Sequence, residues 1–187
     1  FSNQTYVVLQ AANGTAGAVD ITLTATNGAQ TVETNGFTYT AIGVIDTVTP
    51  SNGQFGTRVT IAGSRLLGGG GSAQTVTLVG ASASITSSSA TQVEVIAVSG
   101  TPGLGDVVIT ADTGAVVTKT NGFTYLTASA VTSVSPNFGQ IGSDVTISGS
   151  NMRGGATSVN SVLLAGQAVT SITSENDTVV VVKAAQG

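Results

Sequence analysis

Apolar and polar residues alternate along almost every apolar stretch of the chain. In residues 19–24 (VDITLT) and 59–63 (VTIAG), every second residue is Val, Ile, Leu or Gly, with Thr at most of the positions between them. A period of two is typical of a strand with one buried face. Asn-Gly, Gly-Gly and Pro-containing turns separate these stretches at intervals of about 8 to 12 residues, as in β-sandwiches. The pattern predicts an all-β protein without helices.

The sequence repeats itself at a distance of 86 residues. Residues 35–39 (NGFTY) recur at 121–125, and residues 59–63 (VTIAG) recur at 145–149 as VTISG. Several segments that share one offset indicate a duplicated structural unit. A unit of this length is large enough for a sandwich of about seven strands with its own core.

The chain begins and ends out of phase with this repeat. Residues 1–40 correspond to the C-terminal half of a unit, 41–126 form a complete unit, and 129–187 correspond to an N-terminal half. One strand of the unit is expected three times, at residues 5–9, 91–95 and 178–182. The two outer halves are therefore complementary.

Complementary halves have two explanations. In the first, residues 1–40 of a neighbouring chain complete the half at 129–187 by strand addition, with main-chain hydrogen bonds supplying the affinity. Because such a head-to-tail contact does not close on itself, it generates a filament. In the second, the chain is a window of a longer continuous array. The sequence leaves both explanations open.

Glycine, proline and apolar residues stand at characteristic spacings in the complete unit. The pattern consists of Ile45, Val48, Pro50, Gly53, Gly56, Val59, Ile61, Gly63 and the segments 76–80, 103–108 and 122–125. Its first half returns at Val131, Val134, Pro136, Gly139, Gly142, Val145, Ile147, Gly149 and 162–166, and its closing residues at 36–39. This arrangement resembles the IPT/TIG family. The resemblance implies tandem immunoglobulin-like β-sandwiches of about 86 residues per repeat, a fold of receptor ectodomains, Rel-type transcription factors, modules of starch-acting enzymes and cell-surface arrays.

Composition excludes most catalytic and metal chemistry. The chain has no Cys and no His, which removes thiolate and imidazole ligands and the Ser-His and Cys-His dyads. The pairs Glu175 with Asp177 and Asp106 with Asp112 could help build a calcium site, although solvated acids are the alternative. The glycines at 68–71 lack the Lys-Ser/Thr and the helix of a phosphate-binding loop, so we interpret them as a flexible loop. We expect no enzyme, metal or cofactor.

Charge is sparse along the chain. Five Lys and Arg and nine Asp and Glu leave a net charge of −4 on 187 residues. Five basic residues cannot form a nucleic-acid-binding stripe. No apolar run approaches the roughly 18 to 20 residues of a membrane span, so we expect no direct membrane insertion. A weakly charged surface with strand edges has little protection against association, and we expect it to be coated or assembled.

Three Asn-x-Thr motifs predict N-linked glycans, at Asn3, Asn13 and Asn176. Asn3 and Asn176 fall at the same place in the repeat, where the complete unit has Ser89. That place is a turn leading into a strand, and a surface turn is accessible to modification. The alternative is that these residues only form turns.

These observations favour a structural subunit of an extracellular, glycosylated filament or surface appendage. Its immunoglobulin-like domains would join end to end by head-to-tail strand complementation, with a second copy of the chain as partner. The alternative is a stalk or adhesive binding module of a cell-surface protein that recognises carbohydrate or protein. The absence of Trp disfavours an aromatic sugar platform, and no loop is rich in the Arg, Tyr and Trp of binding hot spots.

Overall fold

The computed structural model describes residues 6–12 and 14–186, and every regular element in them is a strand or a turn. The prediction of an all-β chain is confirmed. None of the described residues belongs to a helix that could cross a membrane. The chain divides into two compact units, Phe1–Ile42 and Gly43–Gly187. The second unit contains the middle repeat (β3 to β11) and the third repeat (β12 to β17).

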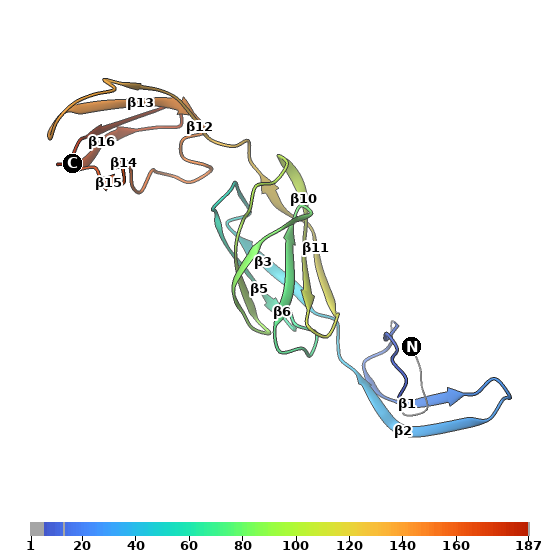
Figure 1. Ribbon diagram of the computed structural model, residues 1–187. Coiled ribbons are helices and arrows are strands. Elements are labelled where there is room, and N and C mark those ends of the chain that lie inside the picture. Colours follow the sequence, from blue (N-terminus) through green and yellow to red (C-terminus); the bar gives the residue numbers. More distant parts are fainter. Residues whose placement is uncertain (1–5, 13, 187) are drawn as a thin grey trace. The chain divides into compact units, whose positions relative to one another are not determined.

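The middle repeat is a two-layer β-sandwich. Its strands are β3 (Val44–Thr49), β4 (Asn52–Gly53), β5 (Arg58–Ser64), β6 (Ala73–Leu78), β7 (Ala81–Ser82), β8 (Ser84–Ser88), β9 (Gln92–Ile96), β10 (Gly103–Ala111) and β11 (Val116–Tyr125). One sheet has the order β4-β11-β10-β6-β7 and the other β3-β5-β9-β8. The sheets lie face to face (Figure 1) and enclose one apolar core between them.

Two aromatic residues of β11 lie at the centre of this core. Phe123 has no exposed surface, and its ring meets Tyr125 edge to face at a centroid distance of 5.2 Å. Thr124 between them is less buried, as expected from the alternation of side chains along a strand. Burial raises the pKa of Tyr125, whose hydroxyl has no hydrogen-bond partner among the described residues.

The third repeat contains one complete sheet and a short hairpin. Its strands are β12 (Ala130–Ser135), β13 (Asp144–Ser150), β14 (Leu163–Leu164), β15 (Gln167–Ala168), β16 (Ser171–Glu175) and β17 (Val179–Lys183). The sheet order β12-β13-β17-β16 reproduces β3-β5-β9-β8, and the β14–β15 hairpin reproduces β6–β7. Figure 1 shows this hairpin on one side of the sheet. Residues 129–186 include no counterpart of β10 and β11.

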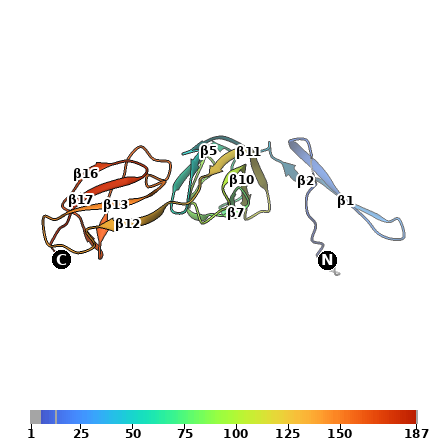
Figure 2. The same ribbon diagram turned by 90° about the horizontal axis from the view of Figure 1, so that it is seen from above.

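The first unit is built around a hairpin of β1 (Gly17–Thr24) and β2 (Gln30–Tyr39), which Figure 1 shows side by side and Figure 2 shows from above. Its register, with Gly17 opposite Tyr39 and an irregularity after Val19, is that of β10 and β11. The main-chain N–H of Asn35 donates to Asp20 Oδ1 at 2.8 Å. In the middle repeat, the main-chain N–H of the corresponding Asn121 donates to Asp106 Oδ1 at 2.9 Å.

The predicted strand at residues 5–9 is wrong for the described part of that segment, which contains only a single bridge residue, Val7. Its counterparts in the other repeats are β9 and β17. In the middle repeat β9 lies between β5 and β8, and the sequence of residues 1–42 contains no counterpart of either. A strand pattern without ladder partners does not form a sheet.

Candidate functional site

The outer strand of the third repeat exposes apolar side chains that the middle repeat buries. Val131 and Val134 of β12 are 60% and 40% exposed, whereas their counterparts Ile45 and Val48 in β3 are 4% and 8% exposed. The local strands are the same in both repeats. The difference follows from β10 and β11, which close the sandwich over β3 and have no counterpart in residues 129–186.

A cavity of about 390 Å³ opens on this side of the third repeat. Its lining includes Val134, Pro136, Phe138, Ile141, Val145 and Leu164. Phe138 and Ile141 are 82% and 63% exposed. The counterparts of Val134, Val145 and Leu164 in the middle repeat are Val48, Val59 and Leu78. They share a core with Phe123 and Tyr125. We call the apolar surface around this cavity the open face.

The open face is bordered by one short strand, β14, and by residues 138–139, which are not in a strand. In the middle repeat β6 has six residues and pairs with β10, whereas its counterpart β14 has two. Likewise β4 pairs with the end of β11, whereas residues 138–139, its counterpart, lie outside any strand. A sheet edge with unpaired main-chain groups is a template for a further strand.

The β1–β2 hairpin also exposes apolar side chains. Leu23 and Phe37 are 44% and 42% exposed, whereas their counterparts Ile109 and Phe123 have no exposed surface. The rings of Phe37 and Tyr39 meet edge to face at 5.0 Å, as the corresponding pair does in the middle repeat. The hairpin is thus folded like β10–β11, and the described residues of its own unit contain no opposing sheet.

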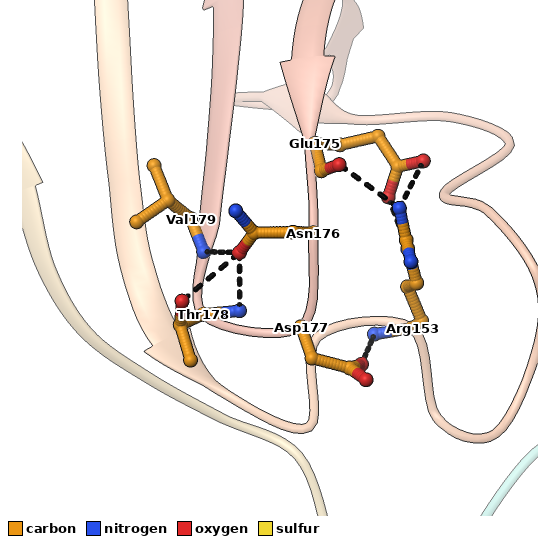
Figure 3. Close-up of polar contacts among 6 residues, drawn as sticks. All are labelled: Arg153, Glu175, Asn176, Asp177, Thr178 and Val179. Carbon is orange, nitrogen blue, oxygen red and sulfur yellow. Dashed lines mark hydrogen bonds and ion pairs between the residues drawn. The ribbon is translucent and has the colours of Figure 1, made fainter.

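The acceptor motif at Asn176 lies in the exposed turn between β16 and β17 (Figure 3). Asn176 Oδ1 accepts hydrogen bonds from the main-chain N–H groups of Thr178 and Val179, each at 2.8 Å, and from Thr178 Oγ1 at 2.9 Å. The side-chain amide therefore caps the turn through its oxygen. Its nitrogen, the atom that a glycan would modify, takes no part in these contacts in Figure 3.

The middle repeat has the same turn with a different residue. Ser89 Oγ accepts from the main-chain N–H of Gln92 at 3.0 Å, and Ser89 N donates to Gln92 O at 2.8 Å, as Asn176 N does to Val179 O. An oxygen at this position is what the turn requires, and both residues supply it. Asn3 and Asn13, the other predicted glycosylation sites, lie outside the described residues.

Arg153 engages both acids that flank Asn176. Its Nε and Nη2 donate to the two carboxylate oxygens of Glu175 at 2.7 and 3.0 Å, and its main-chain N–H donates to Asp177 Oδ1 at 3.1 Å (Figure 3). The hydrogen bond from Arg153 lowers the pKa of Glu175, and the same bond raises the pKa of Arg153. Within residues 6–12 and 14–186, no three acidic side chains gather to hold a metal.

Sequence reasoning missed this ion pair. Arg153 and Glu175 stand where the middle repeat has Leu67 and Ser88. The sequence did contain an indication of this contact: between the two repeats, one position changes to a base and the other to an acid. The pairing also means that a calcium ion at Glu175 and Asp177 would have to displace a guanidinium.

The acids of the middle repeat bind main-chain groups. Asp112 accepts from the N–H groups of Gly71 and Ser72 at 3.2 and 3.1 Å, and Asp106 accepts from Asn121. The glycine loop, which we expected to be flexible, consists of hydrogen-bonded turns closed by this carboxylate, including Gly68 N to Arg65 O at 3.0 Å. These contacts indicate a structural role for both acids.

The family model of the IPT/TIG domain matches residues 44–125 and 129–186. No curated protein matches this chain. Among solved structures, the plexin A4 extracellular region is 21% identical over 80% of this chain and 16% of its own, with a TM-score of 0.50. The surface glycan-binding protein PbSGBP-B of Prevotella bryantii is 12% identical over 80% and 38%, with a TM-score of 0.38. This chain thus spans well under half the length of either, and the plexin likeness shows the fold.

Proposed function

Because this chain belongs to the IPT/TIG family, we propose that it is a non-catalytic interaction segment of an extracellular or cell-surface protein. The observation that carries the proposal is the match of two consecutive repeats, residues 44–125 and 129–186, to the IPT/TIG family, and we place the contact on the open face of the third repeat. Large apolar surface with bordering strand edges is typical of sites that bind other proteins. The segment would bind a partner on this surface.

The open face suits a protein partner better than a carbohydrate. Its cavity is lined by the aliphatic residues Val134, Ile141 and Leu164, by one ring, Phe138, and by the amide side chains of Asn137, Gln140 and Gln167. One ring and three amides are groups that a carbohydrate could contact, whereas the aliphatic part of the lining beside the short strand β14 fits the alternating side chains of an added strand. We therefore favour a partner that contributes β-structure.

A second candidate function is that of a structural subunit in a glycosylated filament. The β1–β2 hairpin favours this function, because it exposes Leu23 and Phe37. Its counterpart in the middle repeat, the β10–β11 hairpin, completes a sandwich. The same chain would then carry both the open face and the element that covers it. A glycan on Asn176 would coat the exposed turn between β16 and β17.

The proposed function is tested with a synthetic peptide that copies residues 103–126, the segment that closes the middle repeat. We expect this peptide to bind the full chain and to slow amide exchange in β12 and β14. Val134→Asp places a charge in the cavity and should abolish binding, whereas Ser133→Asp, on the neighbouring position of the same strand, should not. No binding, or equal loss in both variants, would overturn the proposal.

A further inference from the structure

We propose that the side chain of Gln54 joins the middle and third repeats into one rigid pair. Residues 126–129 connect the two repeats, between the end of β11 and the start of β12. Domains joined by a short connection move relative to one another unless something holds them. The inference goes beyond the proposed function, because it concerns two repeats inside the chain and makes no use of the open face.

The amide of Gln54 binds Ser129 through both of its polar atoms. Its Nε2 donates to Ser129 Oγ at 2.6 Å, and its Oε1 accepts from the main-chain N–H of Ser129 at 2.7 Å. Gln54 lies in the turn between β4 and β5 of the middle repeat, and Ser129 directly precedes β12 of the third. Two hydrogen bonds from one planar amide fix the orientation of the connecting main chain as well as its distance.

The third repeat holds the same connecting residues from its own side. Ser129 Oγ donates to the main-chain carbonyl of Asn151, the residue that follows β13. Asn151 Nδ2 in turn donates to the carbonyl of Thr127 at 3.3 Å. The N–H of Leu126, at the start of the connection, donates to the carbonyl of Gly53 at 2.7 Å. The connection is therefore hydrogen-bonded to both repeats.

The loop after β13 also approaches the middle repeat closely. Gly155 has a φ of +89°, and a Cβ there would lie 2.5 Å from Leu126 Cδ1 and 2.8 Å from Asn52 Oδ1. Its counterpart Gly69 has the same φ, but no atom of the described part of the chain, apart from its neighbours, lies within 4 Å of such a Cβ. The backbone conformation favours glycine at both positions, whereas the close approach is specific to Gly155.

Apolar packing contributes little beside the Gln54 contact. A cavity of about 390 Å³ lies there, lined by Gln54 and Phe55 of the middle repeat and by Arg153 and Ala156 of the third. Phe55 is 72% exposed. The side chains around this cavity therefore do not form a closed apolar interface, and the polar contacts of Gln54 are what holds the repeats together there.

Distances between spin labels test the pair in the full chain, which has no Cys of its own. Ser84→Cys in β8 and Ser171→Cys in β16 place one nitroxide on the same exposed position of each repeat. Double electron–electron resonance between them should give one narrow distance distribution. Gln54→Ala removes both hydrogen bonds to Ser129 and should broaden this distribution about twofold or more.

Gln140→Ala is the matched control, because Gln140 occupies the same turn of the third repeat, at the end of β12 far from the connection. The main-chain N–H of Gln54 donates to Thr57 Oγ1, and that of Gln140 to Ser143 Oγ, each at 3.0 Å. The control should leave the distribution unchanged. A broad distribution before Gln54 is replaced, or equal broadening in the two variants, would overturn the proposal.

A glycine pair gives a second measurement that leaves Gln54 in place. Alanine is strained to a similar degree at Gly155 and Gly69, since both have a φ of +89°. Gly155→Ala must in addition displace Leu126 and Asn52, so it should broaden the same distribution, whereas Gly69→Ala should not. If both broaden it equally, backbone strain and not the contact between the repeats controls the distance, and the proposal is wrong.

Discussion

The middle and third repeats carry the same apolar pattern on the same strands and bury it to different extents. Ile45 is 4% exposed in β3, and Val131, at the same position in β12, is 60% exposed. Their neighbours in the sheet correspond one to one. The position of a residue in a strand is set locally, whereas its burial is set by strands that come from elsewhere in the chain. In this fold the decisive strands are β10 and β11.

The largest predicted loss of stability concerns Phe123, which is buried, in comparison with its exposed counterpart Phe37. Phe123→Ala should destabilise the middle repeat by about 3 to 5 kcal/mol, because it leaves a cavity in a closed core. Phe37→Ala should cost less than about 1 kcal/mol at concentrations where the chain is monomeric, because that ring is already 42% exposed. Urea unfolding followed by circular dichroism measures both. Similar losses would mean that the hairpin is covered within its own chain.

The next predicted effect is on association of the chain, and it concerns Glu33, which stands where the middle repeat has Lys119. Glu33→Lys restores the donor that in the middle repeat reaches the carbonyl groups of Ile45 and Asp46. We expect tighter association of the chain by about 1 kcal/mol, or roughly fivefold in dissociation constant. Glu33→Gln is the matched control, which removes the negative charge without extending the side chain. Sedimentation velocity over a dilution series measures both, and unchanged association would count against the filament, in which the hairpin covers the open face.

Local sequence predicted the strands of the complete unit well, because alternation and turn residues act within a few positions. The repeat of residues 35–39 at 121–125 also predicted two equivalent hairpins. The exposure of Val131 agrees with the prediction that residues 129–187 are half a unit without its closing strands. The lack of a strand around Val7 was not predicted, because it depends on whether distant strands supply a ladder partner. The alternating pattern is the same with and without that partner.

The sites were predictable to a smaller extent. The acceptor motif at Asn176 predicted a surface turn, and the structure places it in one. The contact between Arg153 and Glu175 was not predicted, because the two residues are 22 positions apart and only the fold brings them together. Glycosylation itself stays a prediction, since the capping contacts of Asn176 serve a turn equally well.

The turns at Ser89 and Asn176 allow an exchange between the repeats. Ser89→Asn creates an Asn-Ala-Thr motif in the middle repeat, and Asn176→Ser removes the motif of the third while keeping an oxygen to cap the turn. After secretion from a eukaryotic host, we expect the first variant to gain one N-linked glycan and the second to lose one. Stability should change by less than about 0.5 kcal/mol, because either residue caps the turn. Intact mass before and after enzymatic deglycosylation measures occupancy, and unchanged mass in both variants would refute the glycan at Asn176.

The smallest predicted effect is a loss of stability at acid pH in the third repeat that the middle repeat does not share. Arg153 lowers the pKa of Glu175 in the folded third repeat, so the pair stabilises that repeat at neutral pH. This contribution is lost as the pH falls below the ordinary glutamate value of about 4.3 and then through the lower folded pKa. The middle repeat has Leu67 and Ser88 at these positions and no such loss.

Amide exchange measured by mass spectrometry can resolve this effect in peptides covering β16 and β17. Between about pH 6 and about pH 3, after correction for the intrinsic rate, exchange there should rise in the unchanged chain. Glu175→Gln should remove most of that pH dependence, since it cannot ionise. The control Asp144→Asn breaks the more exposed pair with Lys183 and should leave it in place, because an ion pair 63% and 42% exposed is largely screened by solvent. If both variants behave alike, the acid response belongs to the sheet as a whole and not to the contact beside Asn176.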